Sequence, residues 1–257
     1  MFTTFGYAQS IDQAGAWSRM NALADPTITV ASPEIVVPSL NKLILAAAGI
    51  SSATVINGAR FDAPSIRDIV RPNVQPVNLI AAADVTPNDP ARVLDRRFNP
   101  LTLNPGENVE GWTIGDPAAA HWQWLLGWLA DAPIAPIAAG AEIQSARFTA
   151  TTTLVADQWT NAAISFDDQL AVGHYQVVGL RAEAAGLICA RLFFKGFAWR
   201  PGALGCLTPQ MYGNDVFRNG NLGVYGEFDS VAPPTIDFLS ISADTAEYGI
   251  LDLIKTA

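Results

Sequence analysis

Short apolar runs, interrupted repeatedly by proline and glycine, make up most of the chain after its N-terminal segment. Residues 27–31 alternate between polar and apolar positions, residues 34–37 are rich in β-branched side chains, and residues 53–56 lead into Asn57-Gly58. Alternation and β-branched residues favour strands, and an Asn-Gly pair is typical of a two-residue hairpin. Short strand-like runs separated by proline and glycine predict an all-β sandwich or barrel and argue against alternating strands and helices.

The second half of the chain carries longer strand patterns. Apolar or alternating segments that predict strands occur at residues 146–155, 162–166, 173–181, 186–194 and 236–241. The segment Pro133–Gly140, made of Pro, Ala, Ile and Gly, is expected to connect the two halves. No residue-level repeat relates the halves, so a division into two domains rests on chain length.

A few segments leave room for short helices. The first 25 residues, rich in aromatic side chains, are expected to form an N-terminal arm, within which Ser10 can cap a short helical turn reaching Ala24. Residues 42–48 fit a strand or a short helix. An Ala-rich turn after Pro117 is expected to precede a strand from Trp122 to Leu129.

The chain is poor in charged residues. Half of its 257 residues are hydrophobic and 15% are charged, whereas about 25% is usual in soluble proteins. Because large uncharged apolar patches become interfaces, much of the surface is expected to be covered by neighbouring molecules. A monomer with a large core and a neutral polar surface is the alternative.

The charges that are present argue against nucleic-acid binding. Net charge is −9, and the basic residues are scattered apart from Arg96-Arg97, so no basic stripe follows a phosphate backbone. Twelve of the fifteen basic residues are arginines, which suits interfaces or reflects a GC-rich genome. Cys189 and Cys206 are too few for a disulfide framework and are expected to be reduced and buried.

Candidate catalytic groups are sparse. His121 and His174 are the only histidines, and each lies within an expected strand as a structural residue would. No nucleophile elbow, phosphate-binding loop or metal-ligand spacing occurs. The glycines at 220, 223 and 226 predict a loop between strands. No catalytic, cofactor-binding or metal-binding residue is therefore assigned, and the chain is not expected to be an enzyme.

Paired carboxylates on a β-sandwich are the remaining enzymatic alternative, as in glycoside hydrolysis. The candidates are Asp167, Asp168, Glu227 and Asp229, although the Asp167-Asp168 pair follows an apolar run as a turn would. Sugar rings could stack on the tryptophans at 112, 122, 124 and 128. Alternatively, Trp122, Trp124 and Trp128 fill a sandwich core from one face of a strand.

Several segments resemble the major capsid proteins of small tailless icosahedral bacteriophages built from jelly rolls. The resemblance covers most of the chain from Ala59 to Gly202. The segments that carry it are residues 59–67 (ARFDAPSIR) with Pro72 after them, 99–107 (NPLTLNPGE), 124–131 (WLLGWLAD), 173–181 (GHYQVVGLR), 190–194 (ARLFF) and 200–202 (RPG).

This resemblance implies two jelly-roll barrels or sandwiches side by side, with few short helices. The domains would then be an N-terminal arm at 1–25, a first jelly roll at 26–136 and a second at 137–257. It also implies a structural protein that self-assembles, as pseudo-hexameric trimers, into an icosahedral capsid shell.

The expected partners are copies of the chain itself, other virion proteins and an internal lipid layer, with no cofactor. The expected location is the virion, assembled in the host cytoplasm, because neither a signal peptide nor a transmembrane segment is evident. A carbohydrate-binding or carbohydrate-active β-sandwich and a phage appendage or spike protein remain the alternatives.

Overall fold

The structure is a computed structural model that describes residues 1–11, 16–25, 30–31, 34–36, 43–51, 56–66, 73–74, 77–78, 93–115, 121–183, 187–202, 223–240 and 247–257. Within these ranges the chain forms strands and turns and no helix, which confirms the all-β prediction. Two compact units are present. The N-terminal unit is Thr4–Pro133, and the C-terminal unit is Ile134–Ala257 together with Met1–Thr3.

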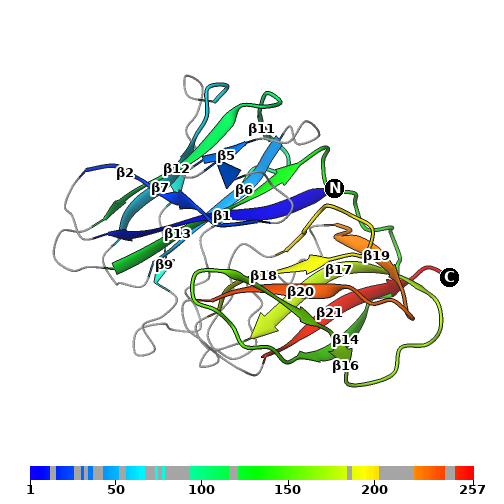
Figure 1. The fold of residues 1–257 in the computed structure, drawn as a ribbon. Helices are drawn as coiled ribbons and strands as arrows, with labels where there is room; N and C mark the ends of the chain where they lie inside the picture. Colours follow the sequence, from blue (N-terminus) through cyan, green and yellow to red (C-terminus); the bar gives the residue numbers. More distant parts are fainter. Residues whose placement is uncertain are drawn as a thin grey trace. The chain divides into compact units, whose positions relative to one another are not determined.

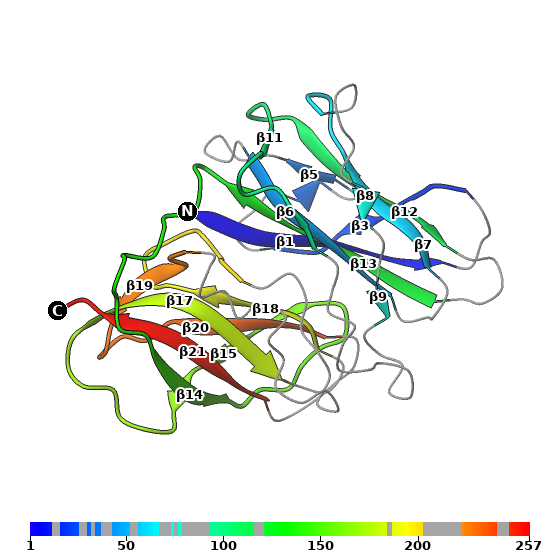
Figure 2. The ribbon, with the colours of Figure 1, turned by 180° about the vertical axis from the view of Figure 1, so that it is seen from behind.

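The N-terminal unit contains two sheets, and most of their strands are labelled in Figure 1 or, from behind, in Figure 2. The seven-stranded sheet contains β1 (Phe2–Ile11), β3 (Asn21–Ala22), β6 (Leu43–Ser51), β9 (Val77–Asn78), β10 (Val93–Asp95), β11 (Leu101–Thr102) and β13 (His121–Ala130). The six-stranded sheet contains β2 (Ser18–Arg19), β4 (Val30–Ala31), β5 (Glu34–Val36), β7 (Ile56–Asp62), β8 (Asn73–Val74) and β12 (Asn108–Gly115).

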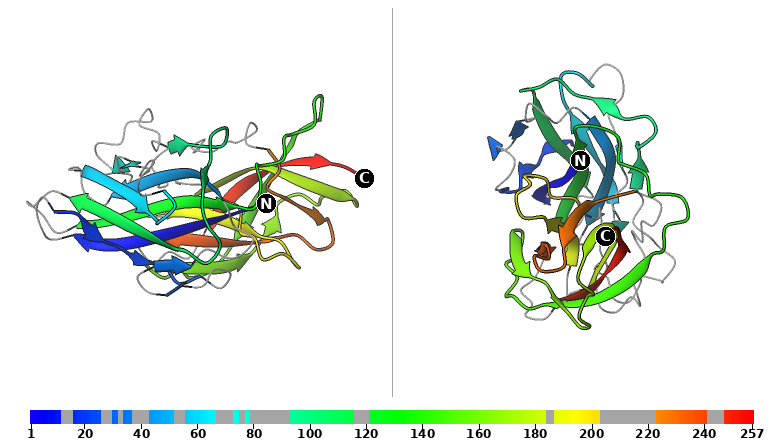
Figure 3. Two further views of the ribbon diagram at one scale, coloured as in Figure 1. Left: turned by 90° about the horizontal axis from the view of Figure 1, so that it is seen from above. Right: turned by 90° about the vertical axis from the view of Figure 1, so that its right-hand side faces the viewer.

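The C-terminal unit also contains two sheets. The five-stranded sheet contains β14 (Gln144–Ala150), β16 (Ser165–Phe166), β17 (His174–Glu183), β19 (Gly226–Asp229) and β21 (Glu247–Lys255). The three-stranded sheet contains β15 (Trp159–Ala163), β18 (Leu187–Phe193) and β20 (Thr235–Ser240). In both views of Figure 3 the C-terminal strand β21, in red, lies among the green strands of its own sheet.

Both units connect early strands to late strands in the same nested order. In the N-terminal unit β1 lies beside the last strand β13, β13 pairs with β6, and β6 pairs with β10; in the C-terminal unit the same positions are taken by β14, β21, β17 and β19. The second sheets correspond as well, because β5-β12-β7 matches β15-β20-β18. Placing first strands against last strands is the arrangement of a jelly roll, which is built from two Greek keys.

The core of the N-terminal unit lies between its two sheets. Phe5 and Tyr7 on β1 pack against Phe61 on β7, with ring centroids 5.1 and 6.0 Å apart. The Tyr7 hydroxyl donates a hydrogen bond to the carbonyl oxygen of Val109 on β12, so this side chain spans both sheets. A Cβ added at Gly127 of β13 would lie 2.7 Å from Phe61 Cζ, so the aromatic cluster needs glycine there.

In the C-terminal unit, aromatic side chains are accommodated by glycines in neighbouring strands. Phe148 on β14 lies directly opposite Gly249 on β21, where a Cβ would lie 2.6 Å from Phe148 Cζ. Phe194, which follows β18, packs against Gly226 of β19, where a Cβ would lie 2.6 Å from Phe194 Cε2. Since β18 and β19 belong to different sheets, the second contact joins the two layers.

Several strand predictions differ from the structure. Asn57-Gly58 does not form a hairpin turn: both residues lie inside β7, where Ile114 pairs with Gly58 and Gly115 with Ile56. Asn57 is therefore the extra residue of a β-bulge, an alternative use of a residue that tolerates unusual backbone angles. Residues 43–48 belong to strand β6 and not to a helix.

The expected N-terminal arm is also wrong for much of its length. Residues 2–11 form β1, which lies between β13 and β3 within the seven-stranded sheet. Ser10 is part of that strand and not a helix cap, and the residues up to Ala24 that the structure describes contain β2 and β3. The Ala-rich turn at 116–120 and the glycine loop at 220 lie outside the described residues. The domain boundaries at 25/26 and 136/137 stay predictions.

Candidate functional site

The histidines do not gather into a catalytic constellation within the described side chains. His174 begins β17, and its Nε2 atom lies 3.4 Å from Glu227 Oε2, with 43% and 48% of these two side chains exposed. Its backbone N–H donates to the carbonyl oxygen of Ala257, which ties the chain end to β17. The imidazole therefore makes a surface contact next to a structural backbone anchor. His121 begins β13, and its side chain lies outside the described part of the structure.

The candidate carboxylates lie on two opposite edges of the five-stranded sheet. Asp167 and Asp168 follow β16 at one edge, whereas Glu227 and Asp229 belong to β19 at the other. The two edges nevertheless approach one another, because Phe166 on β16 stacks on Phe228 on β19 with ring centroids 6.3 Å apart. The role of these carboxylates is therefore judged from their own contacts.

Local contacts of these carboxylates are those of turns and surface pairs. Asp167 Oδ2 forms an ion pair with Arg147, with Nε 3.2 Å away, and Asp229 Oδ1 accepts from the backbone N–H of Val231 at 3.0 Å. Glu227 accepts from the Gln176 amide at 2.8 Å as well as contacting His174. Each of these contacts uses a carboxylate to fix local structure.

The tryptophans of β13 occupy the face opposite to the one expected. Leu125 and Leu129 belong to the core between the sheets of the N-terminal unit. Trp122, Trp124 and Trp128 alternate with these leucines and so lie on the other face of β13, where Trp124 and Trp128 are buried and Trp122 is 41% exposed. The prediction that these tryptophans are buried is confirmed for Trp124 and Trp128, but they lie on the face of β13 opposite the inter-sheet core. Because β13 is apolar on both faces, alternation alone does not identify the inner one.

A second aromatic surface, which we call the Trp17–Trp112 platform, covers part of the six-stranded sheet. It consists of Trp17, Arg19, Arg60, Glu110 and Trp112. Arg19, Trp112 and Arg60 lie in one row across β2, β12 and β7. Since the neighbouring residues on β7, at 59 and 61, belong to the core, this row faces away from it.

Contacts within the Trp17–Trp112 platform hold its side chains in place. The Arg60 guanidinium lies 4.1 Å from the Trp17 ring centroid, and that of Arg19 lies 5.7 Å from the Trp112 ring centroid. Glu110 accepts from Arg19 NH2 at 2.5 Å and from the Trp112 indole N–H at 2.8 Å. Trp112 was a candidate from sequence, but Trp17 was not, because only the sheet register brings it to the same face.

Charged side chains form a buried cluster on the three-stranded sheet. Asp237 on β20 lies directly between Asn161 on β15 and Arg191 on β18. It accepts from Asn161 Nδ2 at 2.6 Å and from Arg191 Nε at 3.0 Å, and Arg200 NH1 lies 3.5 Å away. The Arg191 guanidinium also stacks 3.8 Å from the Trp159 ring centroid. Burial and pairing of opposite charges of this kind indicate a structural role.

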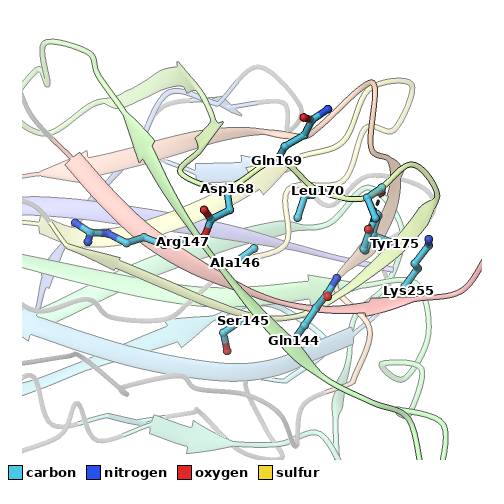
Figure 4. A pocket seen from close by; sticks show the side chains of 10 residues that line it. Gln144, Ser145, Ala146, Arg147, Asp168, Gln169, Leu170, Tyr175 and Lys255 are labelled. Atoms are coloured by element: carbon cyan, nitrogen blue, oxygen red, sulfur yellow. Dashed lines mark hydrogen bonds between the residues drawn. The ribbon is translucent and has the colours of Figure 1, made fainter.

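One cavity of about 360 Å³ opens beside β14 in the C-terminal unit (Figure 4). Its lining includes Arg147, Asp168, Tyr175 and Lys255, and in Figure 4 the Arg147 side chain extends away from those of Tyr175 and Lys255. The Tyr175 hydroxyl is already engaged, donating to a backbone carbonyl at 2.7 Å. The lining carries both positive and negative side chains but no histidine or cysteine. It therefore contains neither a thiol nucleophile nor an imidazole base.

Exposed apolar side chains occur at one end of the C-terminal unit. Val172 and Val231 are 79% and 81% exposed, in turns that flank β17 and β19. Ser230 joins these turns, because its N–H donates to the Gly173 carbonyl at 3.0 Å and its hydroxyl accepts from the Gly173 N–H at 3.1 Å. We call this pair the valine tip. Apolar side chains so exposed are suited to contact with another molecule.

The cysteines, the possible metal ligands and the possible membrane-spanning helices can be checked within the described residues. Cys189 is buried and outside any disulfide, as expected, and Cys206 lies outside the described residues. Among the residues described, His, Cys, Asp and Glu side chains do not gather in threes as a metal site would require. The same residues include no helix with the length and apolar character needed to cross a membrane.

Comparisons with known proteins give distant likenesses. No protein-family model matches the chain, and no curated protein matches it. Among solved structures it is similar to the major capsid protein P2 from Bacteriophage PM2, at 13% identity and a TM-score of 0.24, over 100% of this chain and 98% of that one. It is also similar to a Paenibacillus xanthan lyase, at 13% identity and a TM-score of 0.25, over 100% of this chain and 25% of that one.

Neither likeness carries weight for function at these TM-scores. The class of protein is defined by the strand order itself, which is all-β with antiparallel sheets of the β-sandwich and jelly-roll type.

Proposed function

We propose that this chain is a non-enzymatic structural protein that assembles with copies of itself into a viral capsid shell. The observation that carries the proposal is the repeated jelly-roll strand order in two consecutive units. Jelly rolls build viral capsids but also serve as lectin and cupin domains, so a fold by itself does not define a role. Two jelly rolls in one chain add a geometric argument.

A trimer of such a chain would contain six similar units, since each copy contributes two. Six similar units around a threefold axis approximate a hexagon, and hexagonal tiles pack into closed shells. One chain would then supply the repeated contacts that symmetric assembly requires. A trimer with pseudo-hexameric outline is therefore the building block we propose.

Surface chemistry supports self-association. Charged residues make up 15% of the chain, and the valine tip leaves two branched apolar side chains exposed in the isolated chain. Burying such groups against copies of the chain is favourable. The net charge of −9 opposes direct contact with a packaged genome. A lipid layer or a basic virion protein would line the inside of the shell.

Light scattering coupled to size exclusion, at micromolar protein, tests the proposal. The chain has a mass of 27.3 kDa, and we expect a particle of at least three times that mass. A monodisperse species at the monomer mass, unchanged as protein concentration rises, would exclude a shell protein.

Negative-stain electron microscopy separates the shell from the other oligomeric role. Closed particles or hexagonal plates are expected for a capsid protein. Fibres or isolated spikes would assign the chain to an appendage instead, even though the light-scattering mass would be large in both cases.

A further inference from the structure

The Trp17–Trp112 platform differs from ordinary sheet surface in placing two indole rings and a fixed carboxylate on one side of a sheet. Trp17 and Trp112 are both partly exposed, although their rings are large and apolar. The Glu110 carboxylate lies between polar donors, bound by the Trp112 indole N–H and by Arg19. The platform therefore combines apolar rings with rigid polar groups.

Additional contacts extend this rigidity to the neighbouring strand β5. Arg19 NH1 also lies 3.3 Å from Glu34 Oε1 on β5, and Glu34 Oε2 accepts from the Asn108 side-chain amide. Glu110 and Glu34 thus present carboxylates whose orientation is set before any ligand arrives. Such preorganisation lowers the entropy lost on binding.

A pyranose sugar has the chemistry that this surface matches. One face of its ring carries C–H groups that stack on an indole, while its rim carries hydroxyls that donate to carboxylates and accept from guanidinium groups. We propose that the Trp17–Trp112 platform binds an oligosaccharide of pyranose sugars. Trp112 stacks on one sugar ring while Glu110 and Arg19 hydrogen-bond its hydroxyls.

Other occupants fit less well. A nucleic acid would meet Glu110 and Glu34 in a chain of net charge −9. A second copy of the chain would have to cover the ion pairs of Arg19 with Glu110 and Glu34, in which Arg19 is still 39% exposed, and remove their remaining hydration. Sugar hydroxyls replace the hydrogen bonds of the displaced water, so they avoid this cost.

Isothermal titration calorimetry with cellohexaose, chitohexaose and maltohexaose tests the proposal on the full chain in its native oligomeric state. We expect at least one of these to bind wild type, and Trp112→Ala to weaken that affinity by about tenfold. Trp122→Ala is the matched control, because Trp122 is 41% exposed on a different sheet of the same unit. The affinity of Trp122→Ala for the sugar is expected to equal that of wild type.

Two further variants keep the outcome decisive. Trp17 lies before β2 and outside the strands, so Trp17→Ala tests the platform if Trp112→Ala misfolds by circular dichroism. Glu110→Gln is expected to weaken binding about threefold while retaining shape. Absence of binding by wild type to all three sugars, or equal loss in Trp122→Ala, overturns the proposal. A lower particle mass in Trp112→Ala without any sugar binding would assign the platform to subunit contact instead.

Discussion

Arg191 and Asp237 lie directly opposite one another on β18 and β20, with Arg191 Nε 3.0 Å from Asp237 Oδ2. Both side chains are almost fully buried, at 0% and 5% exposure. The guanidinium stacks on Trp159, and Asp237 also accepts from the Asn161 amide and lies 3.5 Å from Arg200 NH1. A buried charge is tolerated only when it is paired and hydrogen-bonded, so these side chains depend on one another.

Replacing Asp237 by alanine is expected to destabilise the chain strongly. Asp237→Ala leaves the Arg191 guanidinium buried without its carboxylate, which costs about 3–5 kcal/mol in free energy of unfolding. Asp167→Ala is the control, because its pair with Arg147 is exposed, at 37% and 60%, and such pairs contribute about 1 kcal/mol or less. Urea denaturation followed by circular dichroism measures both. Equal losses in the two variants would contradict the role of burial.

Gly127 illustrates the tight packing of the aromatic cluster in the other unit. A Cβ at this position would lie 2.7 Å from Phe61 Cζ and 2.8 Å from Phe5 Cε1. Gly127→Ala is therefore expected to lower the free energy of unfolding by about 1–3 kcal/mol through overpacking. Gly6→Ala is the comparison, because its nearest contact is the flexible end of Leu126 at 2.8 Å, which can move. A melting temperature lowered more by Gly6→Ala would refute this account.

Local pattern was enough to predict strands whose neighbours in sequence are turns. The segments expected at 173–181, 186–194 and 236–241 correspond to β17, β18 and β20. Each carries branched or aromatic residues at strand period. The terminal strands were missed: β1 was taken for an arm, and β21 was not predicted. Both are central in their sheets because a jelly roll pairs its first strand with its last, a long-range relation that periodicity does not contain.

The surfaces were harder to predict than the strands for the same reason. A lone arginine within the apolar segment 187–193 does signal a buried ion pair, yet its partner Asp237 is 46 positions away. Trp17 and Arg60 contact each other only through the register of three strands. Contacts between residues far apart in the sequence cannot be predicted from local pattern. A catalytic motif is local, so a search of the sequence was enough to look for one.

Tyr7 gives the N-terminal unit a characteristic response to alkaline pH. Burial raises the pKa of the Tyr7 phenol well above its usual value, and the charges of Glu110 and Glu34 raise it further. The unfolded chain ionises this group near pH 10 while the folded chain keeps it protonated. Its contribution to the free energy of unfolding is therefore complete below about pH 10 and is lost progressively as pH rises toward the folded pKa.

Tyr7→Phe is expected to separate this contribution from other ionisations. At neutral pH the variant loses the hydrogen bond to the Val109 carbonyl, at a cost of about 1 kcal/mol. Between about pH 9 and pH 11 its stability should fall less steeply than that of wild type, because phenylalanine cannot ionise. Urea midpoints at intervals across this range provide the measurement. Parallel curves would show that Tyr7 does not titrate differently in the two states.

The valine tip allows the proposed self-assembly to be tested without disturbing either core. Val172 and Val231 are 79% and 81% exposed, so replacing both by aspartate should leave the fold intact while placing two charges where apolar contact is proposed. We expect the double variant to need at least about a hundredfold more protein to reach the oligomeric mass, because the two buried valines together contribute about 3 kcal/mol or more. Thr151→Asp, at an exposed threonine of the same unit, controls for added negative charge. Light scattering across a dilution series measures the effect, and identical curves for wild type, the double variant and the control would exclude the valine tip from the assembly contact.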